Sequence, residues 1–268
     1  MKCSLVQMNS ISDKAKNIAM AKELIEKAVN EEKPDWVLLP ETFDWAGGTT
    51  EQRLAAAEIV PGGPAYTMCQ DLAEKHRIFV HAGSINEKVA GENKVYNTTV
   101  VFNREGKQIA LYRKIHLFDV QLADGSAYKE SATVAAGDTP VVVETPFGKM
   151  GLAVCNDVRL PEPFRVLSSR GMDFLVLGAA FTLHTGRDHW LALLRARAIE
   201  NQCYVIAPAQ WGRHNDKRVT FGRSVIIDPW GVELAMAPDR DGVIVAEIDL
   251  QAQKKIRAEL PALTHRRL

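Results

Sequence analysis

Residues 149–163 read KMGLAVCNDVRLPEP, an apolar run followed by a polar turn and two prolines. An apolar run that stops at a turn is typical of a buried strand ending at the edge of a sheet. Pro161 or Pro163 suits the first turn of a following helix, where a missing N–H costs nothing. The stretch therefore predicts a strand over 149–154, a turn at Cys155 and a helix over 162–170.

Strand-like and helical runs alternate along the rest of the chain. Strands outnumber helices, and a hairpin turn at 103–106 is mixed with βα units, which predicts an α/β fold with mixed sheets and helices outside them. We expect helices over 13–30, with Asp13 as N-cap, and over 65–76 and 188–200. The remaining expected strands cover 3–8, 36–39, 78–82, 98–102, 108–112, 174–177, 204–207, 223–227 and 243–248.

The bulk composition is that of an ordinary globular protein, with 268 residues, 46% hydrophobic and 25% charged. No repeat or long linker divides the chain, so we expect a single domain over 1–268. Thirty-three basic residues balance thirty-three acidic ones, so no global field favours nucleic acid or an anionic membrane. The first residues form too short an apolar run for a signal peptide, and no stretch has the length of a spanning helix.

Four cysteines, Cys3, Cys69, Cys155 and Cys203, lie far apart and form no C-x-x-C pair. This pattern indicates reduced thiols and a cytoplasmic protein more than a disulfide framework or a zinc site. Cys155 stands out because a strand–helix junction holds a thiol rigidly, with backbone N–H groups beside it to bind an oxyanion. The alternative is that Cys155 is a small core hydrophobe, as most intracellular cysteines are.

Two further strand ends carry a charged residue. Glu41 follows the apolar run 37–40, so we expect partial desolvation to raise its pKa and make it a better base. The alternative is a carboxylate that caps a helix or faces solvent. Lys114 follows the strand 108–112 and is placed to neutralise an oxyanion or a carboxylate, although a solvated loop lysine is the default.

Three histidines and one glutamate are further candidates for a functional role. His116 is an alternative partner for the thiol in a Cys–His dyad, although a lone His beside apolar residues also suits a structural role. Glu130 lies in a long loop and is a weak signal alone. His184 and His189 are five residues apart with no cysteine nearby, so we interpret them as structural residues and not as metal ligands.

Taken together, these segments resemble the nitrilase superfamily of carbon–nitrogen hydrolases. The resemblance runs from the first strand to about residue 267, with the Glu, Lys and Cys motifs in family order. The matching stretches are 39–43 (LPETF), 83–84 (GS), 96–98 (YNT), 112–119 (YRKIHLFD), 129–131 (KES), 151–162 (GLAVCNDVRLPE), 189–190 (HW), 195–202 (RARAIENQ), 222–224 (GRS) and 228–231 (DPWG).

The resemblance implies a four-layer α-β-β-α sandwich that pairs across a helical face into a homodimer or a higher homo-oligomer. It also implies a small-molecule substrate and no metal or organic cofactor. By motif, Cys155 is the nucleophile, Glu41 the general base and Lys114 the electrophilic stabiliser, with Glu130 as a second glutamate that positions the lysine and the substrate. The backbone N–H of Asn156 is the second oxyanion donor, and acyl transfer proceeds through a thioester.

The chain departs from the family pattern at Asn156, where many amidases of the family have an aromatic residue. The backbone donor survives any side chain, so the departure affects the acyl pocket and substrate choice, not the chemistry itself.

The stretch 209–218 (AQWGRHNDKR) is similar to the branch that hydrolyses deaminated glutathione, close to ω-amidases of 2-oxoglutaramate and succinamate. Such amides end in carboxylates, so a basic pocket rim is expected, with Phe181 and Arg213 as substrate contacts and Lys217 and Arg218 as further basic candidates. A solvated charged loop is an equal alternative. Nitrile hydrolysis, N-carbamoyl amidase activity, a Cys–His hydrolase and a catalytically silent scaffold remain open.

Overall fold

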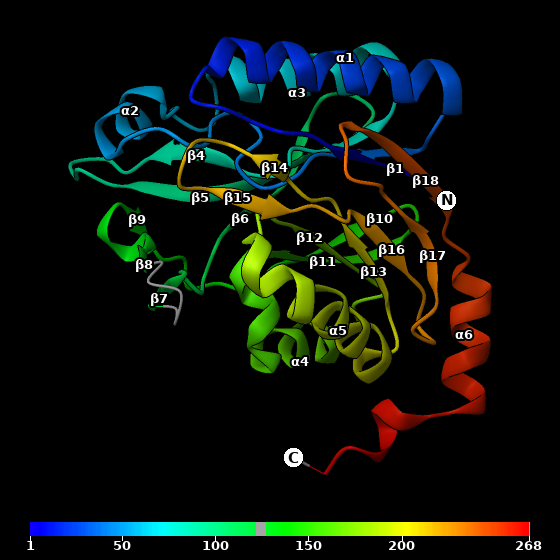
Figure 1. Ribbon diagram of the computed structural model, residues 1–268. Helices are drawn as coiled ribbons and strands as arrows, with labels where there is room; N and C mark the ends of the chain where they lie inside the picture. Colours follow the sequence, from blue (N-terminus) through cyan, green and yellow to red (C-terminus); the bar gives the residue numbers. More distant parts are fainter. Residues whose placement is uncertain (122–126, 268) are drawn as a thin grey trace.

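Two β-sheets lie face to face between two layers of helices in the computed structural model, which describes residues 1–121 and 127–267 (Figure 1). Helices α1 (Lys14–Glu32) and α3 (Pro64–His76) cover the outer face of one sheet. Helices α4 (Pro161–Ser169) and α5 (Leu183–Asn201) cover the outer face of the other. This arrangement confirms the expected α-β-β-α sandwich with mixed sheets.

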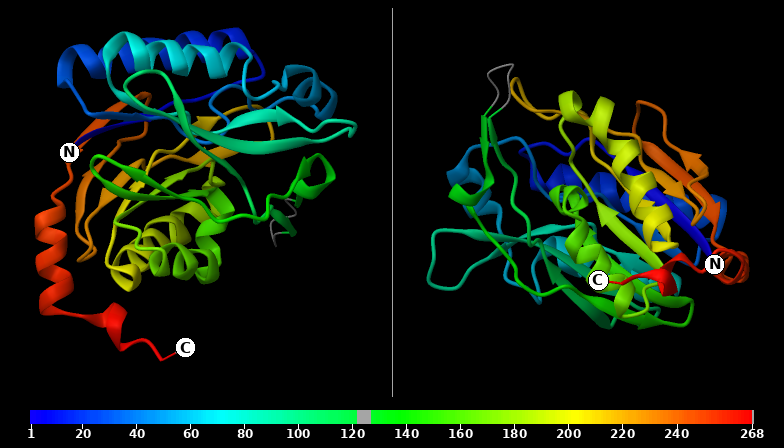
Figure 2. Two further views of the ribbon diagram at one scale, coloured as in Figure 1. Left: turned by 180° about the vertical axis from the view of Figure 1, so that it is seen from behind. Right: turned by 90° about the horizontal axis from the view of Figure 1, so that it is seen from below.

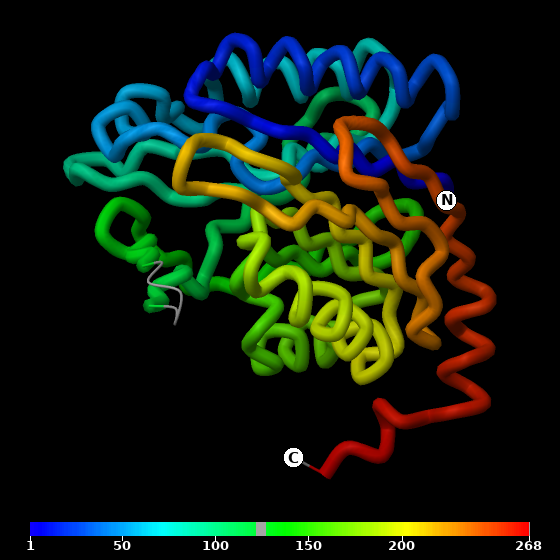
Figure 3. Tube along the Cα trace, viewed as in Figure 1, coloured from blue at the N-terminus to red at the C-terminus, as the bar shows by residue number. Residues whose placement is uncertain are grey.

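The first sheet has the order β18-β1-β2-β3-β5-β4, with β6 and β9 also pairing with β5. Its centre, β1-β2-β3, is parallel, and β18 and β5 are antiparallel to their neighbours. The strands are β1 (Lys2–Gln7), β2 (Trp36–Leu38), β3 (Phe79–His81), β4 (Ile85–Lys88), β5 (Val95–Phe102), β6 (Gln108–Arg113), β9 (Val134–Ala135) and β18 (Gly242–Glu247). Strands from the two ends of the chain thus lie side by side (Figure 3).

The second sheet repeats this plan with the order β10-β11-β12-β13-β16-β17. Strands β11, β12 and β13 are parallel, β10 and β16 are antiparallel to them, and β17 is antiparallel to β16. The strands are β10 (Val142–Thr145), β11 (Gly148–Val154), β12 (Phe174–Gly178), β13 (Tyr204–Ala207), β16 (Val225–Ile227) and β17 (Glu233–Met236). The predicted strand at 149–154 is therefore β11, inside a buried parallel centre, as its continuous apolar run requires.

Aromatic rings fill the space between the sheets. Trp36 of β2 stacks on Phe79 of β3 with ring centroids 4.6 Å apart and meets Phe174 of β12 edge-on at 6.4 Å. Such offset and edge-on contacts stabilise a core beyond the area that they bury. Helix α1 begins where expected, because the Asp13 side chain accepts a hydrogen bond from the Lys16 N–H as an N-cap.

Several elements were not expected from the sequence. The charged stretch 211–218 is not only a loop: β14 (Trp211–Arg213) and β15 (Val219–Phe221) form a ribbon there. Additional elements are α2 (Thr50–Ala56), β7 (Asp119–Gln121), β8 (Ala127–Lys129), the 3₁₀ turns η1 (Glu130–Ala132), η2 (Cys155–Arg159) and η3 (Ala262–His265), and α6 (Leu250–Glu259), which runs down one side of the molecule (Figure 2).

Helix α5 begins at Leu183, five residues before the expected start at residue 188. The helix was predicted to start later because Gly186 lies in its first turn, and glycine is a poor helix former. A Cβ atom at Gly186 would lie 2.4 Å from Cβ of Phe221, so the glycine is needed for β15 to pack on the helix. Among the described residues, no helix is both long and apolar enough to cross a membrane.

Candidate active site

Four predicted residues converge on one cavity of about 470 Å³. Glu41 lies three residues beyond β2, Lys114 directly follows β6, and Cys155 directly follows β11. Because β2 and β11 belong to the parallel centres of two facing sheets, both strands bring their carboxyl ends to the same side of the sandwich. Glu130 joins them from η1, so all four side chains line the same space.

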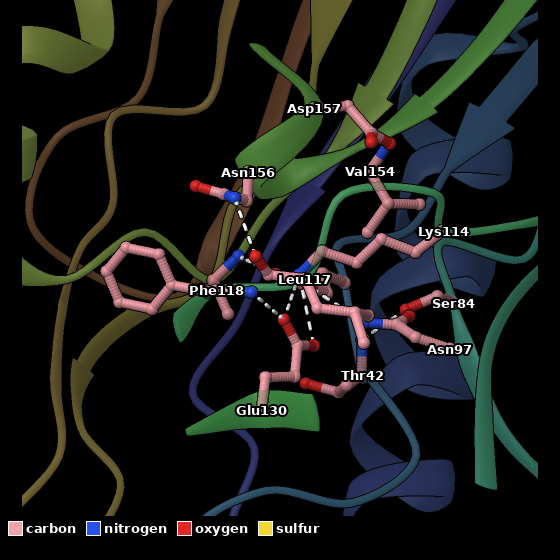
Figure 4. A network of polar contacts seen from close by, with 12 residues as sticks. Thr42, Ser84, Asn97, Lys114, Leu117, Phe118, Glu130, Val154, Asn156 and Asp157 are labelled. Atoms are coloured by element: carbon pink, nitrogen blue, oxygen red, sulfur yellow. Dashed lines mark hydrogen bonds and ion pairs between the residues drawn. The ribbon is translucent and has the colours of Figure 1, made fainter. Parts of the chain in front are cut away.

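Cys155 opens the turn η2 in a left-handed backbone conformation, with φ of +47°. A non-glycine residue in this region costs on the order of 1 kcal/mol or more and persists only where its surroundings hold it. Asp157 supplies that support, because its Oδ2 accepts a hydrogen bond from the Val154 N–H at 2.8 Å (Figure 4). The same oxygen accepts a second hydrogen bond from the Tyr112 hydroxyl at 2.6 Å. The thiol is thus presented at the cavity wall by a fixed turn.

The thiol is neutral at rest. Burial, and next the negative charge of Glu41, raise the pKa of Cys155 well above its usual range, against opposing effects of Lys114 and the Ala180 N–H. Cys155 and Glu41 line the same cavity, and the charge of Glu41 acts on the pKa of the thiol. A base beside a protonated thiol is the arrangement that generates a thiolate only when substrate is attacked.

Glu41 is buried, with only 3% of its surface exposed, and both oxygens of its carboxylate nevertheless accept hydrogen bonds. Oε1 accepts from Asn97 Nδ2 at 2.8 Å and from Lys114 Nζ at 3.2 Å, and Oε2 accepts from the Ala180 N–H at 2.6 Å. A buried charge is tolerated when every lone pair has such a partner. The backbone next to Glu41 is fixed as well, because the Thr42 N–H donates to Ser84 Oγ (Figure 4).

The expected rise in the pKa of Glu41 is wrong. Burial is the largest single influence and does raise it, but the charges of Lys114 and Arg218 oppose burial. Hydrogen bonds from Cys155 and Asn97 add to these charges, and the net result is a lowered pKa. Glu41 is therefore ionised at neutral pH and ready to accept a proton.

Lys114 lies between two carboxylates. Its Nζ is 3.2 Å from Glu41 Oε1, and 3.1 and 2.8 Å from the two oxygens of Glu130 (Figure 4). Burial alone would lower the pKa of Lys114, but Glu130 and then Glu41 outweigh burial and raise it. The solvated-lysine alternative is excluded, because only 2% of the residue is exposed.

Glu130 also fixes the segment that carries the lysine. Its Oε2 accepts the Phe118 N–H at 2.7 Å in addition to Lys114 (Figure 4). One carboxylate thus holds both the ammonium group and the backbone four residues later. This contact gives the weak sequence signal at Glu130 a definite place beside Lys114.

Asn156 follows the nucleophile and lines the cavity. Its Nδ2 donates to the Leu117 carbonyl at 3.0 Å, so its Oδ1 points the other way (Figure 4). This oxygen is buried and has no hydrogen-bond partner in the part of the chain that the structure describes. Its backbone N–H belongs to the first turn of η2, where N–H groups have no acceptor within the helix.

His116 has a different partner from the one the dyad hypothesis requires. Its Nδ1–H donates to Asp157 Oδ1 at 2.8 Å, and this bond is the main reason that the pKa of His116 is raised. The residue is also absent from the cavity lining. His189 contacts the Arg159 guanidinium at 3.1 Å, and the described residues contain no cluster of three or more His, Cys, Asp or Glu suited to a metal ion.

One of the two predicted substrate contacts lines the cavity, and the other does not. Phe181 lines the cavity, with the Arg159 guanidinium 4.7 Å from its ring centroid. Arg213 is exposed on β14 and lies outside the lining of this cavity, whereas Arg218, directly before β15, lines it. Arg213 ends β14 and Arg218 directly precedes β15, so the two arginines lie at opposite ends of the turn that joins these strands. An expected loop over 211–218 gave no basis for choosing between them.

Sequence reasoning missed Asn97 and Ala180, which hold Glu41, and Arg53, which lines the cavity from α2. Asn97 lies in a stretch that matches the nitrilase pattern, so a signal existed without a chemical reason. The Ala180 N–H is a backbone group, and Arg53 lies within α2, a helix that the sequence did not predict. Neither carries a recognisable pattern.

Comparison with known proteins agrees with this geometry. Residues 2–258 match the carbon–nitrogen hydrolase family. A deaminated glutathione amidase of Synechocystis sp. is 45% identical over 264 residues, which are 97% of this chain and 96% of that protein. The human deaminated glutathione amidase is 37% identical, and the match covers 98% of this chain and 81% of that protein.

Solved structures share the fold. The Caenorhabditis elegans NitFhit protein superposes with a TM-score of 0.93 at 39% identity, over 99% of this chain and 65% of that one. This chain therefore spans about two thirds of the length of the NitFhit protein. Saccharomyces cerevisiae Nit3, described as a member of branch 10 of the nitrilase superfamily, superposes with a TM-score of 0.90 at 32% identity, over 100% of this chain and 97% of that one.

Proposed function

The chain belongs to the carbon–nitrogen hydrolase family, and from this premise we propose that it is an amidase using Cys155 as nucleophile, Glu41 as general base and Lys114 as oxyanion stabiliser. The observation that carries the proposal is one carboxylate, Glu41, that lies 3.2 Å from the Lys114 ammonium group and lines the same cavity as the Cys155 thiol, whose pKa it raises. Such a constellation matches acyl transfer, which needs a base at the nucleophile and a positive charge at the oxyanion.

In the first half of the reaction, Cys155 Sγ bonds to the amide carbon while its proton passes to Glu41. The carbonyl oxygen becomes an oxyanion, held by Lys114 Nζ and the Asn156 N–H. Removing one such donor typically costs about 3–4 kcal/mol of transition-state stabilisation. When the intermediate collapses, the C–N bond breaks and Glu41 returns the proton to the nitrogen, so that ammonia or an amine leaves and a thioester remains.

In the second half, Glu41 takes a proton from water as the water oxygen attacks the thioester carbon. A second oxyanion forms at the same donors, and its collapse expels the thiolate, which recovers the proton from Glu41. Glu130 has a distinct task through both halves. Because Glu130 contacts Lys114 through both of its carboxylate oxygens, Lys114 keeps a carboxylate partner while Glu41 is transiently neutral.

The substrate that we propose is a small amide bearing a carboxylate, such as deaminated glutathione or an ω-amide like 2-oxoglutaramate. Two facts support this class. Relatives that the chain covers over most of their length, from Synechocystis sp. and from human, are named deaminated glutathione amidases. The volume of the cavity, about 470 Å³, falls in the range of roughly 300–1,000 Å³ that accommodates small-molecule ligands.

We also propose a homodimer, located in the cytoplasm, that pairs through the α4–α5 face. Val166 of α4, Ile199 of α5 and the neighbouring Trp230 are 37%, 48% and 60% exposed, which is unusual for large apolar side chains gathered on one face. Gly231 lies directly against Ile199, so the turn that carries Trp230 adjoins α5. Light scattering tests this by measuring the molar mass of the wild type and of Ile199→Glu in solution. We expect a dimeric wild type and a monomeric variant, and a monomeric wild type would contradict the proposal.

The activity is tested by measuring ammonia or amine release from deaminated glutathione, 2-oxoglutaramate, 3-cyanopropanoate and N-carbamoyl-β-alanine. Cys155→Ala and Glu41→Gln should each lower amide turnover at least about 10³-fold, with mass spectrometry showing a Cys155 acyl adduct in the wild type. His116→Ala serves as the comparison. Loss of turnover in His116→Ala but not in Glu41→Gln would favour the dyad, and no turnover of any compound would favour the silent scaffold.

A further inference from the structure

The cavity carries a charge that the whole chain does not. The sequence balances thirty-three basic and thirty-three acidic residues, yet among the described residues five basic and only two acidic side chains line the cavity. Both acidic side chains, Glu41 and Glu130, are already paired with Lys114. The described part of the cavity wall therefore leaves the positive charge of the other basic side chains unbalanced.

Two of these side chains, Arg53 and Arg218, face the cavity from different elements. Arg53 belongs to α2, and Arg218 directly precedes β15. Both are partly buried, and among the described residues neither forms an ion pair. Within residues 1–121 and 127–267, the one side-chain hydrogen bond of either guanidinium runs from Arg53 Nη1 to the neutral Thr133 hydroxyl, at 3.3 Å.

The two guanidinium groups affect each other. After burial, the charge of Arg218 is the next largest cause of the lowered pKa of Arg53. Arg218 also lowers the pKa of Glu41, so its charge reaches the catalytic carboxylate. Two like charges held in a partly enclosed space destabilise each other, and an anion bound between them would relieve this repulsion.

The segments that carry the two arginines are fastened together. Asn215 Oδ1 accepts the backbone N–H of Arg218 at 2.8 Å, and its Nδ2 donates to the Gly47 carbonyl in the segment before α2. Gly47 packs so closely there that a Cβ atom would lie 2.8 Å from the His214 carbonyl oxygen. Helix α2 itself begins with a capping box between Thr49 and Gln52. The spacing of the two arginines is thus built into the loops.

Arg159, a third arginine of the lining, is engaged differently. Its guanidinium packs over the Phe181 ring at 4.7 Å and contacts His189 at 3.1 Å. Lys129, the remaining basic residue, is exposed. Arg53 and Arg218 are therefore the pair best placed to receive a ligand.

We propose that Arg53 and Arg218 together bind a carboxylate of the substrate and so select carboxylated amides over neutral ones. This inference rests on the proposed function, because it names the part of the substrate that the same site recognises. Guanidinium groups bind carboxylates through paired N–H···O bonds, and a carboxylate held at a fixed place also orients the amide carbon toward Cys155.

The test compares kcat/KM for succinamate and for butanamide, which has a methyl group in place of the carboxylate. The wild type should prefer succinamate strongly. In Arg53→Gln and Arg218→Gln the ratio of the two kcat/KM values should fall by about 10- to 100-fold, as expected for loss of a charge-assisted hydrogen bond. Arg53→Lys and Arg218→Lys should lose less, and Arg187→Gln, an exposed control outside the cavity, should keep the wild-type ratio.

A wild-type ratio near one, or Gln variants that keep the wild-type ratio, would overturn the inference while leaving the amidase proposal intact. Calorimetric titration of the same proteins with succinate separates the two proposals. If the wild type turns over neither amide but binds succinate, and the Gln variants bind it at least tenfold more weakly, the carboxylate site stands and the amidase proposal fails. If succinate does not bind the wild type, the carboxylate site is refuted.

Discussion

Lys114 Nζ lies 3.2 Å from Oε1 of Glu41, so the proposed oxyanion stabiliser and the proposed base are ion-paired before substrate binds. When Glu41 accepts the thiol proton, it gives up its negative charge as the oxyanion acquires one. Lys114 then exchanges one anionic partner for another without moving far. Preorganised charge of this kind stabilises a transition state because little reorganisation is needed during the reaction.

Glu130→Gln should move the alkaline limb of the pH profile to lower pH. Glu130 is the largest of the influences that raise the pKa of Lys114, so removing its charge lets burial lower that pKa. Lys114 then loses its proton at a lower pH, and kcat/KM falls there. The measurement is kcat/KM between pH 6 and 11 for both proteins. An unchanged alkaline limb would contradict the role given to Glu130.

Gly83→Ala should destabilise the protein and displace Glu41. A Cβ atom at Gly83 would lie 1.9 Å from the Pro40 carbonyl oxygen, and the backbone there has φ of +47°. We expect a loss of roughly 2–4 kcal/mol in the free energy of unfolding, together with a drop in kcat. Urea titration measures the first and turnover the second.

Gly91→Ala is the matched control for that change. Gly91 also has positive φ, at +76°, but a Cβ atom there meets nothing within 4 Å. The variant should lose only about 1 kcal/mol, with kcat retained. Equal losses in the two variants would show that backbone strain, and not the contact with the Glu41 segment, is decisive.

His214 should make the fold sensitive to mild acid. Burial and the charge of Arg218 lower the pKa of His214 to about 4. Its Nδ1–H donates to the Ser10 carbonyl, so Nε2 accepts from the Thr220 hydroxyl and the neutral ring satisfies both contacts. The unfolded chain, with an ordinary histidine pKa near 6.5, binds more protons between pH 6.5 and 4, so stability falls as pH is lowered through that window.

The size of this effect is about 3 kcal/mol over the full window. Urea unfolding at pH 7 and pH 4.5 should show a larger loss for the wild type than for His214→Gln, which cannot gain a proton. A loss of the same size in both proteins would mean that other groups control acid unfolding.

Asn156→Phe should narrow the choice of substrate. The side chain lines the cavity beside the nucleophile, and an aromatic ring would occupy space now open to substrate while leaving the backbone N–H in place. We expect kcat/KM to fall more for deaminated glutathione than for succinamate, by roughly tenfold or more in their ratio. An unchanged ratio would place both substrates away from this wall.

The sequence predicted best where a single pattern determines the structure. The buried run before Cys155 has the length and flanks of a strand, and the Asp13 cap marks the start of α1, so both could be placed. Glu41, Lys114 and Cys155 could be identified because each follows an apolar strand and carries a charged or nucleophilic group. Their convergence depends on two facing sheets, which bring together residues that lie far apart in the chain.

What escaped prediction depends on tertiary contacts. The pKa of Glu41 is set by charges that reach it from Lys114 and Arg218, more than 70 residues away in each case, and local burial pointed in the opposite direction. The choice between Arg213 and Arg218 depends on how the β14–β15 ribbon lies over the cavity. Short strands with mixed polarity give little periodicity from which to infer that ribbon.

The pairing of β1 with β18 has a consequence for biosynthesis. Residues 2–7 are synthesised well before their antiparallel partner at 242–247, because more than 200 residues separate the two strands in the chain. During translation β1 therefore has one edge with unsatisfied N–H and C=O groups, which is open to aggregation with other nascent chains. A chaperone that shields this edge until residue 247 emerges would raise the yield of native protein.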